Sequence, residues 1–319
     1  MNVVNVVPMH PSEPPDSRPP EHTSVLLRES VEALAPKPGG IYVDCTLGRG
    51  GHTEAILSVP DTIVVGFDRD ASALGLATAR LAPFGERLRP VHAPFSELET
   101  ELGRLGIPLV DGILADLGVS SMQLDDGGRG MSFRREGPLD MRMDTSRGET
   151  VLELIDALDD DELANVIYRF GEERRSRRVA RCIKQARAAD ELHTTLDLRR
   201  AVVRAVGPAR IGGVDPATRT FQALRIAVNA ELEELEGLIS VAGRVLVPGG
   251  VLAIISFHSL EDRIVKRAFA GSDVWEPLTK KPVGPTEVEA SENARARSAK
   301  LRAARRRDGH FGGGEERHA

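Results

Sequence analysis

Continuous apolar runs that end at an acidic or turn-forming residue recur along the chain. Such runs are typical of strands in a parallel sheet, because helices bury both faces of that kind of sheet. We predict strands before Asp44, at 62–67 before Asp68, at 88–92, at 112–115 before Asp116, and at 251–256. The pattern therefore predicts an α/β fold in which the strand ends meet at one edge.

The stretch between the fourth and fifth predicted strands is far longer than one crossover helix and has a helical pattern. Thr150 and Thr194 each begin a sequence with capping-box spacing. Apolar residues at helical spacing follow the first of them, at Leu163, Val166, Ile167 and Phe170. We expect an inserted helical subdomain that recognises the substrate.

The domain organisation follows from these patterns and from local composition. A proline-rich start predicts a disordered leader, and a C-terminal region of low hydrophobicity and high basic content predicts a largely flexible segment. The predicted parts are the leader at 1–20, the sheet core at 21–123 and 217–275, the helical subdomain at 124–216 and the basic segment at 276–319.

A glycine-rich turn after the first strand indicates a cofactor pocket. The dinucleotide fingerprint needs a third glycine where this chain has Thr53. The S-adenosylmethionine loop has an acidic strand end and small residues at every second position after it, as in Asp44, Thr46, Gly48 and Gly50. A carboxylate at the strand end would attract the cationic sulfonium of this cofactor, whereas it would repel the pyrophosphate of a dinucleotide. A turn that only reverses the chain is the alternative.

Polar residues at other strand ends are expected in the same crevice as Asp44. Asp68 is predicted to hold a ribose diol, and Asp70 to cap the following helix. Asp116 is expected to converge with Asp44 and Asp68, and His258 follows the fifth strand at the same edge, where a functional and a structural role are equally open.

Composition narrows the class of protein. With 319 residues, 41% hydrophobic and 28% charged, the chain can bury a full core. Cys45 and Cys182 lie far apart without metal-ligand spacing, so no metal site is expected. No stretch suits a membrane span and no signal peptide is apparent, which favours a cytoplasmic protein.

Local charge indicates possible nucleic-acid contacts, although the net charge is -6. One basic cluster lies on a predicted helix between Arg174 and Arg187, and another extends from Arg295 to Arg307. Both are compatible with RNA binding, because phosphate attraction supplies much of the affinity, and with a solvated helix and tail.

The chain closely resembles the RsmH (MraW) family. The resemblance extends from about His22 to Arg302 and is carried by these segments: 22–27, 48–52, 116–123, 137–144, 171–174, 216–226, 255–266 and 294–302. It implies a class I S-adenosylmethionine-dependent methyltransferase fold, Rossmann-like with a mostly parallel sheet and an inserted helical subdomain. It also implies methylation of the exocyclic N4 of a cytidine in the decoding region of 16S ribosomal RNA, within the small ribosomal subunit.

The resemblance also implies site residues. Cofactor contacts fall on Gly50, Gly51, His52, Asp68, Phe95, Asp116 and Gln123. Departures from the family pattern are Met122, Met131 and Asp215, and Met122 leaves the loop before Gln123 less constrained.

Catalytic and RNA-binding residues are predicted from position and chemistry. We predict catalytic roles for Asp116 and His258, and RNA contacts for Arg142, Arg219 and Arg225. A DNA amino-methyltransferase and a non-catalytic RNA-binding module remain alternatives, and the oligomeric state stays open.

Overall fold

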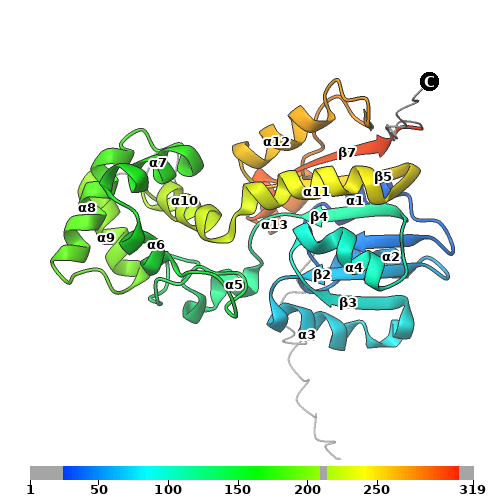
Figure 1. Ribbon diagram of the computed structural model, residues 1–319, viewed down its shortest axis with the longest axis horizontal. Coiled ribbons are helices and arrows are strands. Elements are labelled where there is room, and N and C mark those ends of the chain that lie inside the picture. The colour runs from blue at the N-terminus through cyan, green and yellow to red at the C-terminus, as the bar shows by residue number, and fades with distance from the viewer. Residues whose placement is uncertain (1–23, 209–213, 309–319) are drawn as a thin grey trace, which may run out of the picture.

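The computed structural model describes residues 24–208 and 214–308, and Figure 1 shows that they form two adjoining parts. One part is a sheet with helices on both faces, and the other consists of helices. The predicted leader at 1–20 and the last residues, 309–319, lie outside the described residues. No helix within the described ranges is both long enough and apolar enough to cross a membrane.

Within the described residues, one sheet contains the strands β1 (Ile41–Asp44), β2 (Ile63–Asp68), β3 (Leu88–His92), β4 (Val110–Asp116), β5 (Leu246–Ser256), β6 (Trp275–Pro277) and β7 (Lys300–Arg306). Their order is β3-β2-β1-β4-β5-β7-β6. The strands from β3 to β5 are parallel, and β7 is antiparallel to β5 and β6. The predicted mostly parallel sheet is confirmed, and its parallel strands end at one edge.

Helices cover both faces of this sheet because successive strand side chains alternate between two apolar layers. Val43 and Ile113 belong to one layer, whereas Tyr42 and Leu114 belong to the other. The helices around the sheet are α1 (Leu27–Leu34), α2 (Gly51–Leu57), α3 (Ala71–Arg80), α4 (Leu98–Arg104), α11 (Glu231–Val245), α12 (Ser259–Phe269) and α13 (Glu287–Glu292). Short 3-10 turns are η1 (Ala82–Arg87), η2 (Phe95–Glu97), η3 (Gly127–Arg129) and η4 (Ala296–Ser298).

The helical part contains α5 (Ser121–Asp125), α6 (Val151–Ala157), α7 (Asp160–Gly171), α8 (Ser176–Ala188), α9 (Thr195–Val206) and α10 (Thr218–Asn229). Thr150 and Thr194 form the predicted capping boxes at the starts of α6 and α9. The apolar faces of these helices enclose a hydrophobic core of their own, distinct from the two layers around the sheet. This core gives the helical part an internal source of stability.

Helix α10 packs with the helical part, although its residues fall in the segment 217–275 that we assigned to the sheet core. Phe221 packs edge-on against Phe133, with ring centroids 5.2 Å apart. Gly171 lets α7 approach α10 closely, since a Cβ there would lie 2.5 Å from the carbonyl oxygen of Arg219. The structural boundary therefore falls after α10.

Strand β7 corrects the prediction that 276–319 is largely flexible. The strand lies inside the sheet, between β5 and β6. Lys300 and Arg302 contact the Asp262 carboxylate at 3.1 and 2.7 Å. The prediction is wrong for 276–308 because these basic side chains have partners on the folded core, a tertiary effect that local composition does not reveal.

Candidate active site

A pocket lies at the carboxyl ends of the parallel strands, where the sequence predicts a cofactor crevice. Its wall includes residues from the loops after β1, β2, β3 and β4, from the helical part and from the C-terminal segment. Of the predicted cofactor contacts, the wall contains Gly51, His52, Asp68, Phe95, Asp116 and Gln123. The fold thus brings together residues that are far apart in the sequence.

The glycine turn after β1 is closely packed against Leu81 and Ser24. Gly48 and Gly50 have φ values of 52° and 80°, in the left-handed region that favours glycine. A Cβ on Gly50 would lie 2.7 Å from Leu81 Cδ1, and one on Gly51 would lie 2.1 Å from Ser24 Oγ. Gly50 therefore shapes the turn without lining the pocket, whereas Gly51 forms part of the wall.

Asp44 lies beneath the pocket instead of in its wall. Its carboxylate is 1% exposed and accepts hydrogen bonds from Thr53 Oγ1 at 2.7 Å and from the Thr46 N–H at 3.1 Å. The threonine that breaks the dinucleotide pattern thus fixes the strand end to helix α2. Of the three carboxylates expected in the crevice, Asp68 and Asp116 line it.

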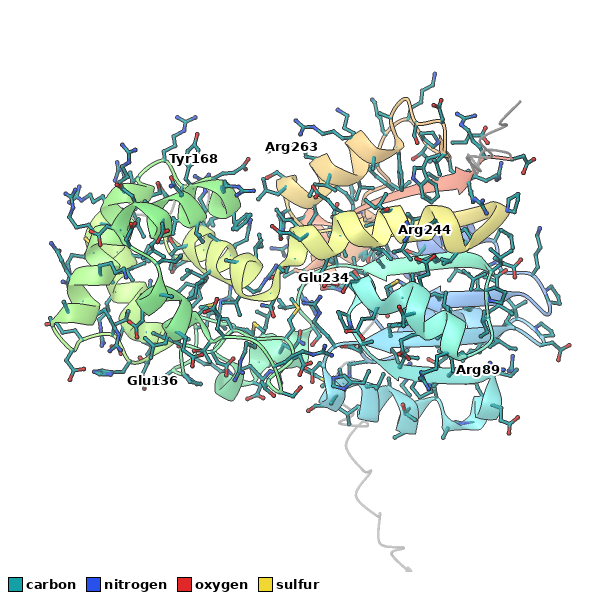
Figure 2. The ribbon with its side chains drawn as sticks, in the orientation of Figure 1. Arg89, Glu136, Tyr168, Glu234, Arg244 and Arg263 are labelled. Carbon is teal, nitrogen blue, oxygen red and sulfur yellow. The ribbon has the colours of Figure 1, made fainter. Side chains whose placement is uncertain are left out.

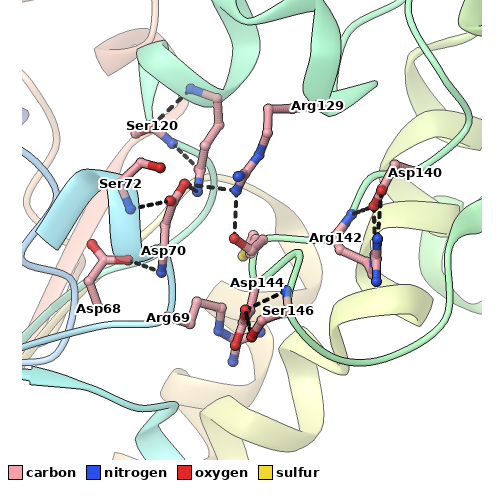
Figure 3. A network of polar contacts seen from close by, with 12 residues as sticks. Asp68, Arg69, Asp70, Ser72, Ser120, Arg129, Asp140, Arg142, Asp144 and Ser146 are labelled. Atoms are coloured by element: carbon pink, nitrogen blue, oxygen red, sulfur yellow. Dashed lines mark hydrogen bonds and ion pairs between the residues drawn. The ribbon is translucent and has the colours of Figure 1, made fainter. Parts of the chain in front are cut away.

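The Asp68 carboxylate is oriented by the backbone. Oδ2 accepts from the Gly48 N–H and Oδ1 from the Asp70 N–H, both at 2.8 Å. Burial raises the Asp68 pKa to about 6, although these hydrogen bonds oppose the rise. Figure 3 shows Asp70 beside it, where Asp70 caps α3 through the Ser72 N–H as predicted. Each Asp68 oxygen retains acceptor capacity for a ligand hydroxyl.

Asp116 presents a buried acceptor that has no hydrogen-bond partner within the described residues. This atom is Oδ1, and the residue's own N–H donates to Thr46 Oγ1 at 2.7 Å. Burial raises the Asp116 pKa to about 8, while the positive charge of Arg295 acts in the opposite direction. An unpaired buried acceptor costs free energy, which a ligand that donates a hydrogen bond would recover.

His52 is a neutral, fixed part of the wall. Its Nε2 lies 3.1 Å from the carbonyl oxygen of Val25. Because a carbonyl only accepts, Nε2 carries the proton and Nδ1 is left as an acceptor. Burial lowers the His52 pKa to about 4, so the ring is uncharged at pH 7. The ring contributes polarity to the pocket without adding positive charge.

Gln123 belongs to a buried polar network at the boundary between the sheet core and the helical part. Its Nε2 donates to Asp70 Oδ2 at 3.0 Å, and its Oε1 accepts from the Ser120 N–H at 2.9 Å. Arg129 donates to the same Asp70 oxygen at 2.8 Å and to the carbonyl of Met143 at 2.6 Å. Gln123 lines the pocket while both ends of its amide are already bonded.

Phe95 is half-buried and packs against the apolar layer of the sheet while also lining the pocket. The guanidinium carbon of Arg69 lies 5.6 Å from the Phe95 ring centroid. Arg69 is held in turn by an ion pair with Glu234 at 3.4 Å. The ring is thus fixed at the wall, in a position that permits the expected contact with a purine.

His258 lies behind the pocket wall. Its Nδ1 accepts from the Glu261 N–H at 3.4 Å, which caps α12, and its Nε2 is 3.2 Å from Glu261 Oε1. Glu261 lines the pocket, whereas His258 does not. His258 thus contacts a residue of the pocket wall, and its side chain caps the first turn of α12.

The three arginines predicted to bind RNA occupy different environments. Arg225 forms two hydrogen bonds with Glu231, at 2.7 and 2.8 Å. Arg142 is held in the same way by Asp140, with both bonds at 2.8 Å. Arg219 is exposed. Two of the three therefore already have carboxylate partners, and Arg219 is the most accessible of them.

Arg295 is a pocket residue that sequence reasoning placed in a basic surface cluster. It lines the pocket together with Asn293, and its guanidinium donates to the carbonyl of Val119. Burial lowers the pKa of Arg295, and the negative charge of Asp116 opposes this shift. The sequence carried one signal, an arginine within a family-like segment, but nothing in it separated Arg295 from its basic neighbours.

The family model described as "MraW methylase family" matches residues 20–307. The Ribosomal RNA small subunit methyltransferase H of Sorangium cellulosum is 70% identical, covering 96% of this chain and 98% of that protein. The protein of the same name from Deinococcus radiodurans is 52% identical, covering 89% of each. A solved rRNA methylase from Streptococcus thermophilus is 12% identical, with a TM-score of 0.43, covering 88% of this chain and 94% of that one.

Proposed function

Because this chain belongs to the MraW methylase family, we propose that it methylates the exocyclic N4 of a cytidine in the decoding region of 16S ribosomal RNA, using S-adenosylmethionine. The observation that carries the proposal is 70% identity to a ribosomal RNA small subunit methyltransferase over nearly the whole of both chains. The family and the class I methyltransferase fold predicted from the sequence are confirmed.

The pocket fits a cationic cofactor that has no phosphate. The unpaired Oδ1 of Asp116 and the carboxylates of Glu231 and Glu261 line the pocket, where they can accept hydrogen bonds from a ligand and, when ionised, balance its positive charge. Asp68 is our candidate for the ribose diol, and Phe95 for the adenine face. When bound, S-adenosylmethionine would supply the electrophilic methyl group.

The remaining predicted contacts support the cofactor in different ways. Gly51 and His52 form wall on the side of the glycine turn, and Gly50 keeps that turn in its left-handed conformation. Gln123 holds the loop after β4 through its hydrogen bond with Ser120. We propose that the cofactor contacts Gly51 and His52 directly, while Gly50 and Gln123 maintain the shape of the pocket.

Asp116 is the residue to which we assign the catalytic role. The amino group of cytosine is a poor nucleophile because its lone pair is delocalised into the ring. An acceptor that takes a hydrogen bond from that amino group orients the nitrogen, and it can receive the proton that the methylated nitrogen releases. The unpaired Oδ1 of Asp116 provides such an acceptor in the pocket wall.

His258 acts in this proposal as a positioning residue. Its contacts with Glu261 fix the start of α12 and the carboxylate that lines the pocket. His258→Ala should therefore lower kcat less than Asp116→Ala does, and His258→Asn, which can still cap a helix, should restore much of the loss. An equal loss of kcat in both His258 variants would instead support a direct catalytic role for the imidazole.

We propose ribosomal RNA in the small subunit as the substrate and, with it, a cytoplasmic enzyme. Arg219 is the accessible member of the predicted RNA contacts. A DNA amino-methyltransferase is the second candidate by chemistry, but such enzymes typically carry a Pro-Pro-aromatic segment where this chain has Leu117-Gly118-Val119. No structural observation favours that alternative.

The test is to incubate the protein with labelled S-adenosylmethionine and small ribosomal subunits from cells that lack the gene. We expect label on cytidine N4 at one decoding-region site, located by nucleoside mass spectrometry. Asp116→Ala should abolish transfer even at cofactor concentrations that saturate the variant. Cofactor binding without transfer to subunits, naked RNA or DNA would contradict the proposed activity and favour a non-catalytic RNA-binding module.

A further inference from the structure

A second hollow lies on the surface where the helical part meets α12, apart from the cofactor pocket. Its lining comes from the end of α7 and the loop that follows it, from the start of α10 and from the first half of α12. The residues are Tyr168, Arg169, Glu172, Arg174, Arg219, Leu260 and Arg263. Figure 2 shows Tyr168 on the helical part and Arg263 on α12. The hollow is therefore shared between the two parts of the molecule.

The hollow has an excess of positive charge. Four arginines line it and a single carboxylate, that of Glu172, opposes them. Arg263 donates to Glu172 Oε1 at 2.9 Å, so this pair is largely neutralised. Arg174 is exposed and forms no ion pair within 24–208 or 214–308. Its charge is available to an anionic ligand such as a phosphate.

An aromatic side chain is exposed beside these arginines. Tyr168 is 60% exposed, although tyrosine rings generally bury much of their surface. Exposed aromatic rings next to basic residues are the arrangement by which proteins hold unpaired nucleotides, with the base stacked on the ring and the phosphate beside the cation. The chemistry of the hollow matches single-stranded RNA better than a neutral ligand.

One helix turn connects this hollow to the cofactor pocket. Leu260 and Arg263 line the hollow, while Glu261 between them lines the pocket. Glu172 fastens the two parts here, because its Oε2 also accepts from Ser259 Oγ at 2.9 Å. An RNA strand with one nucleotide in the pocket would place a neighbouring nucleotide at the hollow.

We infer that the hollow binds a nucleotide adjacent in the RNA to the methylated one, with its base on Tyr168 and its phosphate on Arg174 and Arg219. This inference rests on the proposed function, because it takes RNA as the substrate. It assigns Tyr168, which no sequence pattern marked, to the interaction with the target strand. It also makes the helical part a direct contributor to substrate positioning.

The experiment measures the binding of a fluorescent single-stranded RNA that contains the target cytidine, over a range of salt concentrations. Tyr168→Ala should weaken binding about tenfold, while Tyr168→Phe keeps the ring and should bind as the native protein does. Arg174→Ala should lower the slope of log affinity against log salt by about 0.7. Tyr168→Ala should leave that slope unchanged, because it removes no charge.

Arg89→Ala is the matched control for the lost charge. Arg89 lies on β3, away from the hollow in Figure 2, and forms no ion pair within the described residues. Its variant should retain both the affinity and the salt dependence of the native protein. Affinity for S-adenosylmethionine, measured by calorimetry, should be unchanged in all four variants because none of these residues lines the cofactor pocket.

The outcomes separate the inference from the proposed function. Native activity on small subunits with unchanged RNA binding in Tyr168→Ala and Arg174→Ala would overturn the inference alone. Loss of methylation with subunits but not with naked RNA would reassign the hollow to a protein partner, and would also overturn it. Absence of transfer by the native protein would contradict the proposed function, and the inference with it.

Discussion

At the scale of single residues, Asp116 combines burial, a missing hydrogen-bond donor and a raised pKa in one carboxyl group. Because its pKa is about 8, the group is mainly protonated at pH 7 in the absence of a ligand. A positive charge brought into the pocket favours the ionised form. Binding of a cationic ligand should therefore displace a proton from this group.

We predict that affinity for S-adenosylmethionine increases with pH. Between about pH 6 and pH 8 the increase should approach tenfold per pH unit, since one proton is released on binding. The increase should level off above the Asp116 pKa of about 8. Titration calorimetry in two buffers of different ionisation enthalpy measures both the affinity and the number of protons released.

S-adenosylhomocysteine is the control ligand for this prediction, because its sulfur carries no positive charge. Its affinity should depend much less on pH. Asp116→Asn, which cannot ionise, should flatten the profile for the cationic ligand between pH 7 and 8. Parallel pH profiles for the two ligands would contradict the assignment of Asp116 as the carboxylate that faces the sulfonium.

Strand-end carboxylates could be located from the sequence, but not distinguished by function. Asp68 and Asp116 reach the pocket wall, whereas Asp44 is turned beneath it by the hydroxyl of Thr53. A strand pattern fixes where a residue lies along the edge but leaves its hydrogen-bond partner unspecified. The same limit applies to His258, whose position next to the pocket was foreseen without its role as a helix cap.

At the scale of elements, strand β7 is the component whose loss should most reduce the stability of the sheet core. It covers the edge of β5 over six pairs of residues and is the sheet partner of β6. Leu301 is 2% exposed and packs in the layer that also contains α1 and α2. An uncovered β5 edge would also be open to pairing with another chain.

Truncation after Ala299 should therefore leave an unstable, aggregation-prone protein. The milder substitution Leu301→Ala should reduce the free energy of unfolding by about 2–5 kcal/mol, since it creates a cavity in the core. Chemical denaturation of the two variants and the native protein measures these differences. A stable, cofactor-binding protein truncated after Ala299 would contradict the role assigned to β7.

Most of the strands that sequence patterns located are buried on both faces, and β3 is the partly exposed exception among them. Thr62 to Phe67 forms a continuous apolar run and becomes β2. By contrast, Lys300 to Arg306 is rich in arginine and alanine, and only its folded partners reveal it as a strand. Hydrophobic periodicity records burial by apolar contacts, so it misses a strand whose basic side chains are neutralised by Asp262.

At the scale of the whole molecule, the sheet core and the helical part are joined by polar contacts of unequal burial. Arg129, with 13% of its side chain exposed, pairs with Asp70 across the boundary. Arg147, with 52% exposed, contacts Glu97 of η2 at 3.3 Å. Burial should decide which of these two contacts holds the parts together.

We predict that Arg129→Ala lowers the free energy of unfolding by about 2–3 kcal/mol, because it removes the positively charged partner of the buried Asp70 carboxylate. The matched variant Arg147→Ala should cost less than about 1 kcal/mol, as exposed ion pairs do. Urea denaturation followed by circular dichroism compares them. Equal losses in the two variants would contradict a boundary held mainly by the buried network.

The division into two parts could be predicted from the sequence, while its boundary could not. The long helical stretch between β4 and β5 indicates an insertion, because a crossover needs far fewer residues. The apolar stripe of α10 does not indicate which core the helix packs in, so the sequence alone puts α10 in the sheet core, whereas it packs in the core of the helical part. Contacts such as that between Phe133 and Phe221 decide the matter, and they join residues distant in the sequence.

The cofactor pocket takes its wall from both ends of the chain, Ser24 and Val25 at the start and Asn293 and Arg295 near the finish. A growing chain emerges from the ribosome with its N-terminus first, so the side facing Asp116 is the last to appear. A nascent polypeptide can pair its first strands but cannot yet enclose the cofactor. The pocket is therefore completed only after Asn293 and Arg295 have been synthesised and have folded onto the sheet, so a nascent chain that lacks this segment should not hold the cofactor.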